Sequence, residues 1–314
     1  MRKLLLVFII FFGCKESTTN LLTSSSGNLN EISVALSDEL WKGPVGNTLK
    51  ESFSKPIYGL PQREPMFSLR HIPIRVFSGF VTKNRTIIKV QKAKKTQTLV
   101  QYNKYATPQL VIQFFGPNTK EIIKLIKKDS DSMVSLINKL EINEKQRRIK
   151  KSLSKSSDLK TNFKIDLKYP SVYRVAKSKN DFIWLRKDTN SGSLNLMVYD
   201  DSSKDQLDNN YINIRDSISR LHIPGPVDKT SMSVDKGYIV KSIEGVINNI
   251  HYKEYRGMWE VTDQFMAGPF IGYEFEDTKN QRKIYIDGFV YAPSVKKRSY
   301  VFELESIIKS IIIN

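Results

Sequence analysis

Residues 271–290, IGYEFEDTKNQRKIYIDGFV, decide the fold of this chain. Apolar side chains alternate with other residues in both arms of the stretch, which is typical of strands with one buried face. These residues are Ile271, Tyr273 and Phe275 in the first arm and Ile284, Ile286 and Val290 in the second. Residues 277–280, Asp-Thr-Lys-Asn, favour a turn. The stretch therefore predicts an antiparallel hairpin.

An amphipathic helix is predicted directly after this hairpin. Pro293 ends the second strand, and the apolar residues that follow fall on one face of a helix: Val301, Leu304, Ile307, Ile308 and Ile311. A sheet with one apolar face is stable when such a helix covers it. We therefore expect an α+β fold in which antiparallel sheets pack against amphipathic helices.

Similar elements are predicted along the rest of the chain. A long helix starts near Thr119, with apolar residues at helical spacing and lysines elsewhere around it. Such a basic helix can lie on an anionic membrane or cover a core, and we expect the second. Other strands are expected at 31–36, 86–91, 109–115, 162–167, 182–186 and 194–199, and other helices at 45–53 and 211–221, with a polar turn region at 200–210.

The domain organisation follows from these elements. We expect a signal peptide at 1–13, a lipidated cysteine and flexible tether at 14–30, and two α+β halves at 31–150 and 151–314. The stretch 144–160 is rich in Lys, Arg and Ser and is the candidate linker. Both halves pair strands with an amphipathic helix, so a duplicated unit is one interpretation and two unrelated α+β units is the other.

The first residues indicate export and lipidation. Arg2 and Lys3 precede nine apolar residues, and Gly13 stands before Cys14, the only cysteine. This is the pattern of a lipoprotein signal, in which diacylglycerol is attached to the cysteine sulfur before cleavage. An ordinary secretory signal or an uncleaved anchor is the alternative. Lys15 follows the cysteine, which favours the outer membrane over inner-membrane retention.

The net charge of +18 favours anionic neighbours. Export removes nucleic acid as a partner, and no nucleic-acid-binding motif is present. Acidic lipid headgroups, lipopolysaccharide phosphates, an anionic envelope polymer or a protein partner remain. The alternative is that the lysines only solvate the surface.

Several blocks of the chain resemble a family of bacterial lipoproteins that is catalogued only as a domain of unknown function, family 4837. The blocks are Ser26-Gly27, Leu40-Trp41, Val45-Gly46, Leu60-Pro61-Gln62, Glu64-Pro65, Phe67, Arg256-Gly257-Met258-Trp259, Met266-Ala267-Gly268-Pro269-Phe270, Gly288-Phe289-Val290-Tyr291-Ala292-Pro293 and Lys297-Arg298. One departure is Arg85-Thr86, where the resemblance implies an Arg-Asn pair. The resemblance implies export and lipidation, and it implies no substrate or catalytic residue.

The sequence gives no metal or cofactor motif. His71, His222 and His251 are far apart and form no ligand pattern, so we expect neither a metal nor a cofactor. No Gly-x-Ser-x-Gly motif for a nucleophilic serine occurs.

The best candidates for binding lie near the predicted hairpin. Arg256 could hold an anion while Trp259 stacks on a ligand. The nearby charged and aromatic residues are Glu260, Asp263, Asp287 and Tyr291, and a proline-bracketed loop adds Gln62 and Glu64. The alternative is that these residues set turns, fill the core and pair with one another.

These observations give two hypotheses about function. The first is a lipid-anchored, non-enzymatic envelope protein that binds a partner or assembles with one. The second is an envelope hydrolase acting on a glycan or peptide, in which two of Glu260, Asp263 and Asp287 converge at about 5 to 9 Å in an open cleft.

Overall fold

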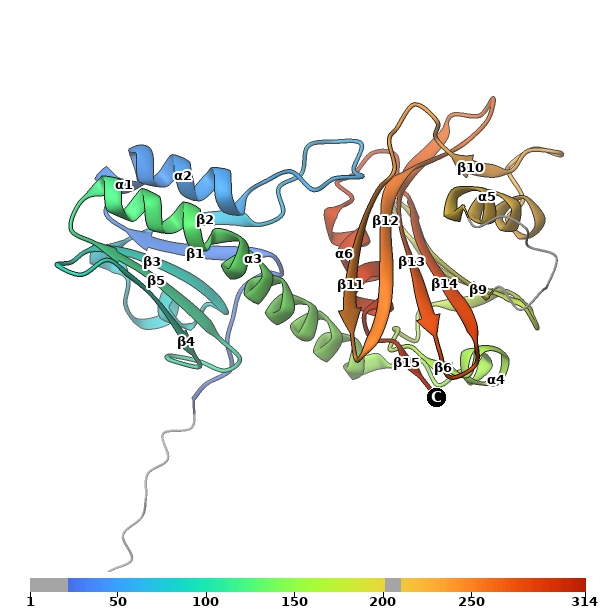
Figure 1. Cartoon of the computed structure of the whole chain (residues 1–314), viewed down its shortest axis with the longest axis horizontal. Coiled ribbons are helices and arrows are strands. Elements are labelled where there is room, and N and C mark those ends of the chain that lie inside the picture. The colour runs from blue at the N-terminus through green and yellow to red at the C-terminus, as the bar shows by residue number, and fades with distance from the viewer. Residues whose placement is uncertain (1–21, 201–209) are drawn as a thin grey trace, which may run out of the picture.

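The structure, a computed structural model, describes residues 22–200 and 210–314. The predicted signal peptide, Cys14, the first part of the predicted tether and most of the polar turn region lie outside the described residues. Figure 1 shows two bodies, each built on a curved sheet, with the helix α3 (Thr119–Ile149) running from one to the other.

The N-terminal body contains a five-stranded sheet of order β2-β1-β3-β5-β4. Its strands are β1 (Glu31–Leu36), β2 (Ser68–Pro73), β3 (Thr86–Lys92), β4 (Gln97–Tyr102) and β5 (Leu110–Gly116). One face packs against α1 (Asp38–Lys42), α2 (Pro44–Phe53) and α3 (Thr119–Ile149). The short 3₁₀ segments η1 (Ile74–Val76) and η2 (Gly79–Lys83) follow β2.

Local sequence signals explain where these helices begin. The Ser37 hydroxyl accepts a hydrogen bond from the backbone N–H of Leu40 at the start of α1. Pro44 occupies the first turn of α2, where its missing N–H removes no helical bond. The Asn118 side chain accepts from the N–H of Glu121 and caps α3.

The C-terminal body contains an eight-stranded sheet in which every pairing is antiparallel. Its order is β10-β12-β13-β14-β9-β8-β7, with β11 paired to β12. The strands are β7 (Arg174–Lys179), β8 (Phe182–Thr189), β9 (Gly192–Asp200), β10 (Met232–Val234), β11 (Lys241–Ile247), β12 (Ile250–Val261), β13 (Met266–Asp277) and β14 (Arg282–Tyr291).

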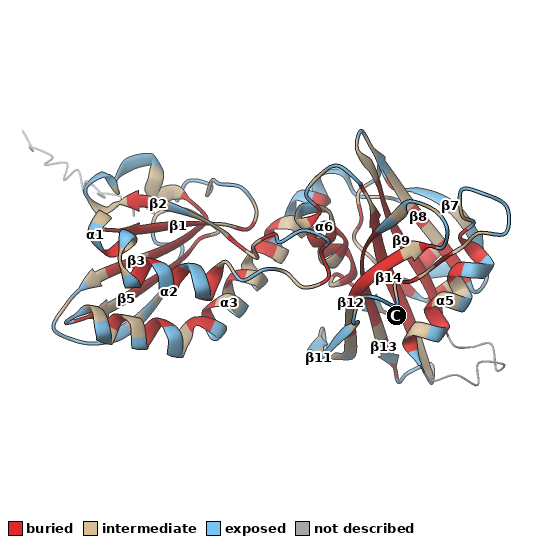
Figure 2. Cartoon of the chain, turned by 90° about the horizontal axis from the view of Figure 1, so that it is seen from above, coloured by how far each residue is buried: buried red, intermediate tan, exposed pale blue. Residues whose placement is uncertain are grey.

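Two helices cover opposite faces of this larger sheet, and Figure 2 shows the buried residues between them and the strands. The helix α6 (Arg298–Ile308) packs on the face that carries Ile271, Tyr273 and Ile286. The helix α5 (Tyr211–His222) packs on the face that carries Trp259, Phe270 and Phe289. A short helix α4 (Asp158–Phe163), a small sheet of β6 (Ile165–Asp166) with β15 (Ile312–Ile313), and the 3₁₀ segment η3 (Lys150–Ser152) complete the described elements.

The predicted α+β class is confirmed, and the hairpin 271–290 forms as β13 and β14 with α6 beside it. The smaller sheet differs from the expectation of antiparallel pairing, because β1 pairs parallel with β2 and β3, and β3 pairs parallel with β5. The two bodies therefore differ in size and strand direction, which contradicts the interpretation of a duplicated unit.

The predicted linker at 144–160 is wrong over its first part, because α3 continues to Ile149. Glu144 lies inside this helix, where its buried carboxylate accepts from Arg147 and Arg148. Paired charges thus support a helical stretch that has few apolar residues. The predicted strand at 162–167 is also mostly wrong, since α4 occupies Asp158–Phe163 and only Ile165–Asp166 pair as β6.

The predicted tether ends earlier than residue 30. Ser25 N–H donates to the Thr107 carbonyl at 3.0 Å, and Ser26 N–H donates to the Lys83 carbonyl at 2.9 Å. Asn30 is buried and its N–H donates to the Glu141 carboxylate. Residues 22–30 are therefore part of the N-terminal body. Within 22–200 and 210–314, no helix combines the length and apolar character needed to cross a membrane.

Candidate functional site

A loop of the N-terminal body, residues 54–67, wraps onto the C-terminal body and forms one side of the candidate site. We call it the connecting loop. The Tyr58 hydroxyl donates to the Ile239 carbonyl, and the Gly59 N–H donates to the Tyr238 hydroxyl at 3.2 Å. Leu60 enters the core between the larger sheet and α6. Gly59 has a φ of 84°, which a residue with a side chain rarely adopts.

Glu64 fastens the connecting loop to α6. Its carboxylate is buried and accepts from the backbone N–H of Lys297 at 2.6 Å and of Arg298 at 3.1 Å. These are the free N–H groups at the start of α6, where the helix dipole favours a negative charge. The Arg298 guanidinium donates in return to the Pro65 carbonyl at 2.9 Å.

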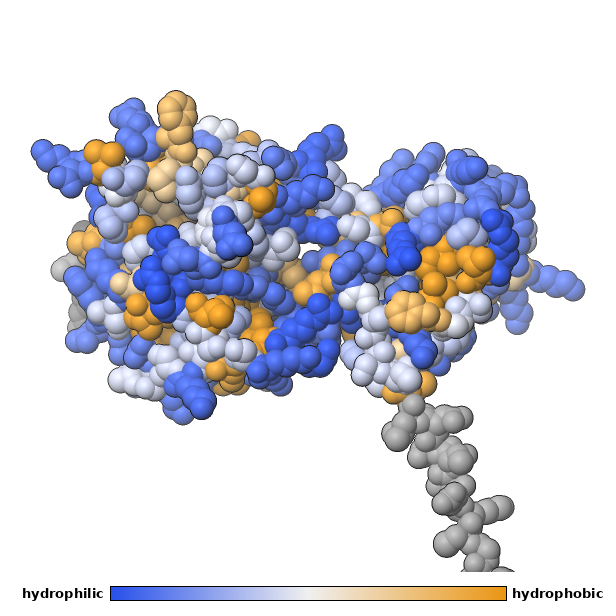
Figure 3. All heavy atoms as spheres, turned by 180° about the vertical axis from the view of Figure 1, so that it is seen from behind, coloured by the Kyte–Doolittle hydropathy of each residue, from blue (hydrophilic) through white to orange (hydrophobic). Residues whose placement is uncertain are grey.

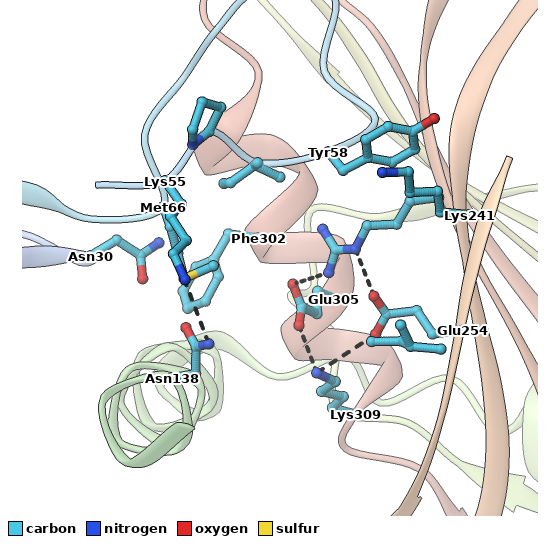
Figure 4. A pocket seen from close by; sticks show the side chains of 14 residues that line it. Asn30, Lys55, Tyr58, Met66, Asn138, Lys241, Glu254, Phe302, Glu305 and Lys309 are labelled. Atoms are coloured by element: carbon cyan, nitrogen blue, oxygen red, sulfur yellow. Dashed lines mark hydrogen bonds and ion pairs between the residues drawn. The ribbon is translucent and has the colours of Figure 1, made fainter. Parts of the chain in front are cut away.

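A cavity of about 430 Å³ lies between the connecting loop, α3, β11, β12 and α6 (Figure 4). Both bodies contribute to it. Its lining residues are Asn30, Lys55, Pro56, Ile57, Tyr58, Met66 and Asn138 from the N-terminal body and Lys241, Ile243, Glu254, Arg256, Phe302, Glu305 and Lys309 from the C-terminal body. A volume of this size is typical of sites that hold a small organic molecule.

Charged side chains form one wall of the cavity. Arg256 donates to Glu254 at 2.6 Å and to Glu305 at 2.9 Å, and Lys309 donates to Glu305 at 2.6 Å. The Tyr273 hydroxyl donates to the other oxygen of Glu254. Figure 4 shows Glu254, Glu305 and Lys309 close together between β12 and α6. The arrangement fixes the guanidinium and both carboxylates, since each makes at least two contacts.

These contacts shift the pKa of Glu305 and of Lys309. Burial alone would raise the pKa of Glu305, but the charges of Lys309 and Arg256 outweigh it and lower that pKa to about 2. Burial would lower the pKa of Lys309, yet Glu305 and Glu254 raise it. Glu305 and Lys309 therefore both stay charged at neutral pH.

The opposite side of the cavity is apolar and opens past two more lysines. Ile57, Met66 and Phe302 line it, and Ile243 lies exposed on the edge strand β11. Lys241 sits with its ammonium 4.2 Å from the centre of the Tyr58 ring, and Lys55 pairs with the exposed Asp131 at 3.5 Å. The cavity thus combines an apolar surface with a surplus of cationic over anionic lining residues.

Two family models match the chain, and residues from both matched ranges line this cavity. Residues 152–310, just over half of the chain, match the family described as Domain of unknown function (DUF4837). The chain belongs to this family. Residues 25–150 match a second model, Domain of unknown function (DUF8532). The N-terminal blocks of the resemblance, including Leu40-Trp41 and Glu64-Pro65, therefore fall in the second match and the C-terminal blocks in the DUF4837 match.

Solved structures share only a distant likeness with the chain. A point mutant of the protein Mog1 is 9% identical with a TM-score of 0.30, and 48% of this chain covers 90% of that one. The Saccharomyces cerevisiae Ran-binding protein Mog1p is 8% identical with a TM-score of 0.30, and the match covers 48% of this chain and 89% of that one. A Bacteroides thetaiotaomicron structure is 10% identical with a TM-score of 0.19, and the match covers 48% of this chain and 45% of that one. These likenesses carry no argument about function. No curated protein matches the chain.

The structure separates the two residues that we expected to act together in the DUF4837 region. Arg256 and Trp259 are three positions apart on β12, so their side chains leave opposite faces of the sheet. Arg256 lines the cavity. Trp259 is buried on the α5 side, where its indole N–H donates to the Val290 carbonyl at 3.2 Å. The prediction of a joint Arg256 and Trp259 site is therefore wrong, and Trp259 fills the core.

The three carboxylates of the hydrolase hypothesis do not converge. Asp287 is fully buried against α5, where it accepts from the hydroxyls of Tyr199 and Tyr211 and from Arg215. Asp263 is exposed in the β12–β13 turn with a φ of 60°. Glu260 pairs with Ala267 across β12 and β13, whereas Asp287 is opposite Gly272, five positions further along β13. The expected carboxylate pair in an open cleft is absent.

The remaining predicted residues take separate places. Tyr291 lines a second cavity of about 260 Å³ on the α5 side, together with Trp184 and Met266. Gln62 is exposed in the connecting loop, while Glu64 binds α6. No group of three or more His, Cys, Asp and Glu side chains suited to a metal ion occurs among the residues that the structure describes.

Sequence reasoning missed most of the cavity wall. Glu305 and Lys309 stand four apart on a predicted helix, and Glu254 and Arg256 stand two apart on a strand, so each pair was visible as a local contact. The contact between the pair on α6 and the pair on β12 depends on tertiary packing, which cannot be predicted from a local sequence pattern.

Proposed function

We propose that this chain is a lipid-anchored protein of the bacterial cell envelope that binds a small amphiphile with an anionic group in the cavity between its two bodies. The observation that carries the proposal is the cavity itself. It joins an apolar side to a wall of fixed charges, and residues of both bodies line it. Pockets that are mostly apolar with a few oriented polar groups are the usual sites for small ligands.

The charges of the lining favour an anionic ligand over a cationic one. Four cationic side chains line the cavity, against two carboxylates, Glu254 and Glu305, and both carboxylates already bind Arg256 or Lys309. Lys241 contacts the Tyr58 ring at the cavity and forms no ion pair within the described ranges. An anionic head near Lys241 would gain a partner, and its apolar body would cover Ile57, Ile243 and Phe302.

The proposed anchor is Cys14, which would carry lipid and hold the protein to the outer membrane. The support for it is the lipoprotein signal pattern of residues 1–14. Its test is labelling of cells with a clickable palmitate, comparing the wild type with Cys14→Ala, followed by membrane fractionation. We expect label in the outer-membrane fraction for the wild type and none for the variant. An unlabelled wild type would contradict the anchor.

The cavity is tested with the probe 1-anilinonaphthalene-8-sulfonate, an aromatic body with one sulfonate. We expect saturable binding to the wild type and an affinity about tenfold weaker for Lys241→Glu, because that change replaces attraction for the sulfonate by repulsion. The matched control is Lys279→Glu, the same charge change at an exposed turn residue far from the cavity lining. Equal affinities for the two variants would refute a site at Lys241.

A further inference from the structure

An exposed apolar surface lies beside the first described residues. It consists of Leu22, Val76, Phe80 and Tyr102, and we call it the entry surface. Phe80 is 72% exposed, in the 3₁₀ segment η2. Figure 3 shows hydrophobic side chains gathered on the rear face of the N-terminal body, among hydrophilic ones. An aromatic side chain with this exposure in a polar protein marks a contact surface when others accompany it.

Backbone pairing fixes the position of the entry surface next to the start of the body. Residues 22–26 run between the loop that ends at Lys83 and the loop that contains Thr107, and they hydrogen bond to both. The Gln109 side chain ties the same region together by donating to the carbonyls of Thr82 and Asn84 at 2.7 and 2.8 Å. The surface is therefore held rigidly around the point from which the chain leads back to Cys14.

The stretch of chain that carries Val76, Phe80 and Tyr102 holds only cationic charges, and Asp38 of α1 pairs with one of them, Arg75, at 2.9 Å. Residues 65–120 contain ten Lys and Arg and no Asp or Glu. Lys89 places its ammonium 5.0 Å from the Phe77 ring, and Lys104 places its ammonium 5.4 Å from the Tyr105 ring. Those two rings meet edge to face at 6.1 Å. Lys83, Lys89 and Lys104 form no ion pair in the part of the chain that the structure describes.

We propose that the entry surface rests on an anionic lipid bilayer, with Phe80 and Val76 entering the headgroup region and Lys83, Lys89 and Lys104 facing the lipid phosphates. Aromatic and aliphatic side chains beside lysines are the composition of surfaces that bind membranes peripherally. The inference rests on the proposed function for its anchor. Cys14 is eight residues before Leu22, so lipid on Cys14 would hold the surface within about 28 Å of the bilayer.

The rival membrane contact is the β12–β13 turn, where Phe265 is fully exposed. In Figure 1 this turn lies at the far end of the molecule from the first described residues. The two contacts predict different orientations. With the entry surface on the membrane, the β12–β13 turn with Phe265 would lie away from the lipid.

The test uses the lipidated full chain in vesicles of phosphatidylcholine with phosphatidylglycerol. Once Cys14 carries lipid, the chain has no other cysteine, so Phe80→Cys and Phe265→Cys each supply one thiol for a nitrobenzoxadiazole fluorophore. We expect spin-labelled lipids to quench the fluorophore at position 80 and to leave the one at position 265 unchanged. Quenching only at 265, or at neither position, would overturn the proposal while leaving the anchor intact.

A second experiment measures membrane binding of the chain without lipid on Cys14. The mature chain from residue 14 with Cys14→Ser is sedimented with the same vesicles and with vesicles of phosphatidylcholine alone. We expect binding to the anionic vesicles only, weakened about tenfold or more in Val76→Ser/Phe80→Ser, and unchanged in Phe265→Ser. Val76, Phe80 and Phe265 are all exposed, so folding should be retained in these variants. Binding that does not respond to Val76 and Phe80 would refute the entry surface, whether or not Cys14 carries lipid.

Discussion

Glu64 shows how one side chain joins the two bodies. It comes from the connecting loop, in the region of the second family match, and it caps α6 in the DUF4837 region. The two blocks Glu64-Pro65 and Lys297-Arg298 stood out in the sequence as separate pieces of a resemblance. The structure brings them into direct contact.

Substitution of Glu64 tests this joint. Glu64→Ala removes the acceptor of two N–H groups at the start of α6, and we expect the free energy of unfolding to fall by about 2 to 3 kcal/mol. Urea unfolding followed by circular dichroism measures the change. Gln62→Ala is the control, because Gln62 is exposed in the same loop. A loss for Glu64→Ala no larger than that of the control would contradict the joint.

Glu305 makes the free energy of unfolding depend on pH in the acidic range. Its pKa falls from 4.5 to about 2 on folding, because Lys309 and Arg256 outweigh the effect of burial. A lowered carboxyl pKa stabilises the folded state above pH 4.5, and this contribution is lost as the pH falls towards 2.

We therefore expect the wild type to lose stability on acidification more steeply than Glu305→Gln. The difference should reach about 3 kcal/mol between pH 5 and pH 2. Thermal or urea unfolding across this range, run on both proteins, measures it. Parallel pH profiles for the two proteins would mean that Glu305 titrates normally in the folded state.

The element that links the bodies is α3. Its first turns pack on the smaller sheet through Ile122 and Ile126, and its last turns reach α6, where Lys145 donates to Glu303 at 2.7 Å. Between these ends, the buried Glu141 accepts from Arg85 twice at 2.9 Å and from the Thr86 hydroxyl at 3.1 Å. The helix thus spans both bodies, and its apolar face covers a core.

Glu141→Gln tests the contribution of α3. The change replaces the carboxylate that lies 2.9 Å from the buried Arg85 by a neutral amide and leaves that guanidinium only the more distant Glu144, at 4.0 Å. Removing one partner of a buried ion pair costs roughly 3 to 5 kcal/mol. Asp131→Asn is the control on the same helix, since Asp131 is exposed and pairs only with Lys55 at the surface. Chemical unfolding distinguishes them, and similar midpoints would show that the buried pair contributes little.

Elements with a clear apolar period could be predicted from the sequence, and those held by polar contacts could not. The hairpin 271–290, the helix 211–221 and the terminal helix follow from alternation or helical spacing. The end of α3 and the ordered residues 22–30 depend on Arg85 and on Glu141 or Glu144, which lie far apart in sequence. Arg256 was predicted as a binding residue, but one of its two partners, Glu305, comes from α6.

At the scale of the whole molecule, the two proposed roles belong to two different places, the entry surface and the cavity between the bodies. The entry surface would meet the bilayer, and the cavity would hold a ligand between the bodies. Because α6, β11 and β12 of the C-terminal body line the cavity together with Asn30, the connecting loop and α3 of the N-terminal body, a ligand there would contact both bodies at once. Binding should therefore stabilise the folded chain against separation of the two bodies.

The most direct test of this account is a methyl NMR titration with 1-anilinonaphthalene-8-sulfonate. With isotope-labelled Met and Ile methyl groups, we expect saturable shifts at Met66, Ile57 and Ile243, which line the cavity from both bodies. Met232 and Met266, which line the smaller cavity on the α5 side, should not shift. Shifts confined to Met232 and Met266, or to one body alone, would contradict a ligand site between the two bodies.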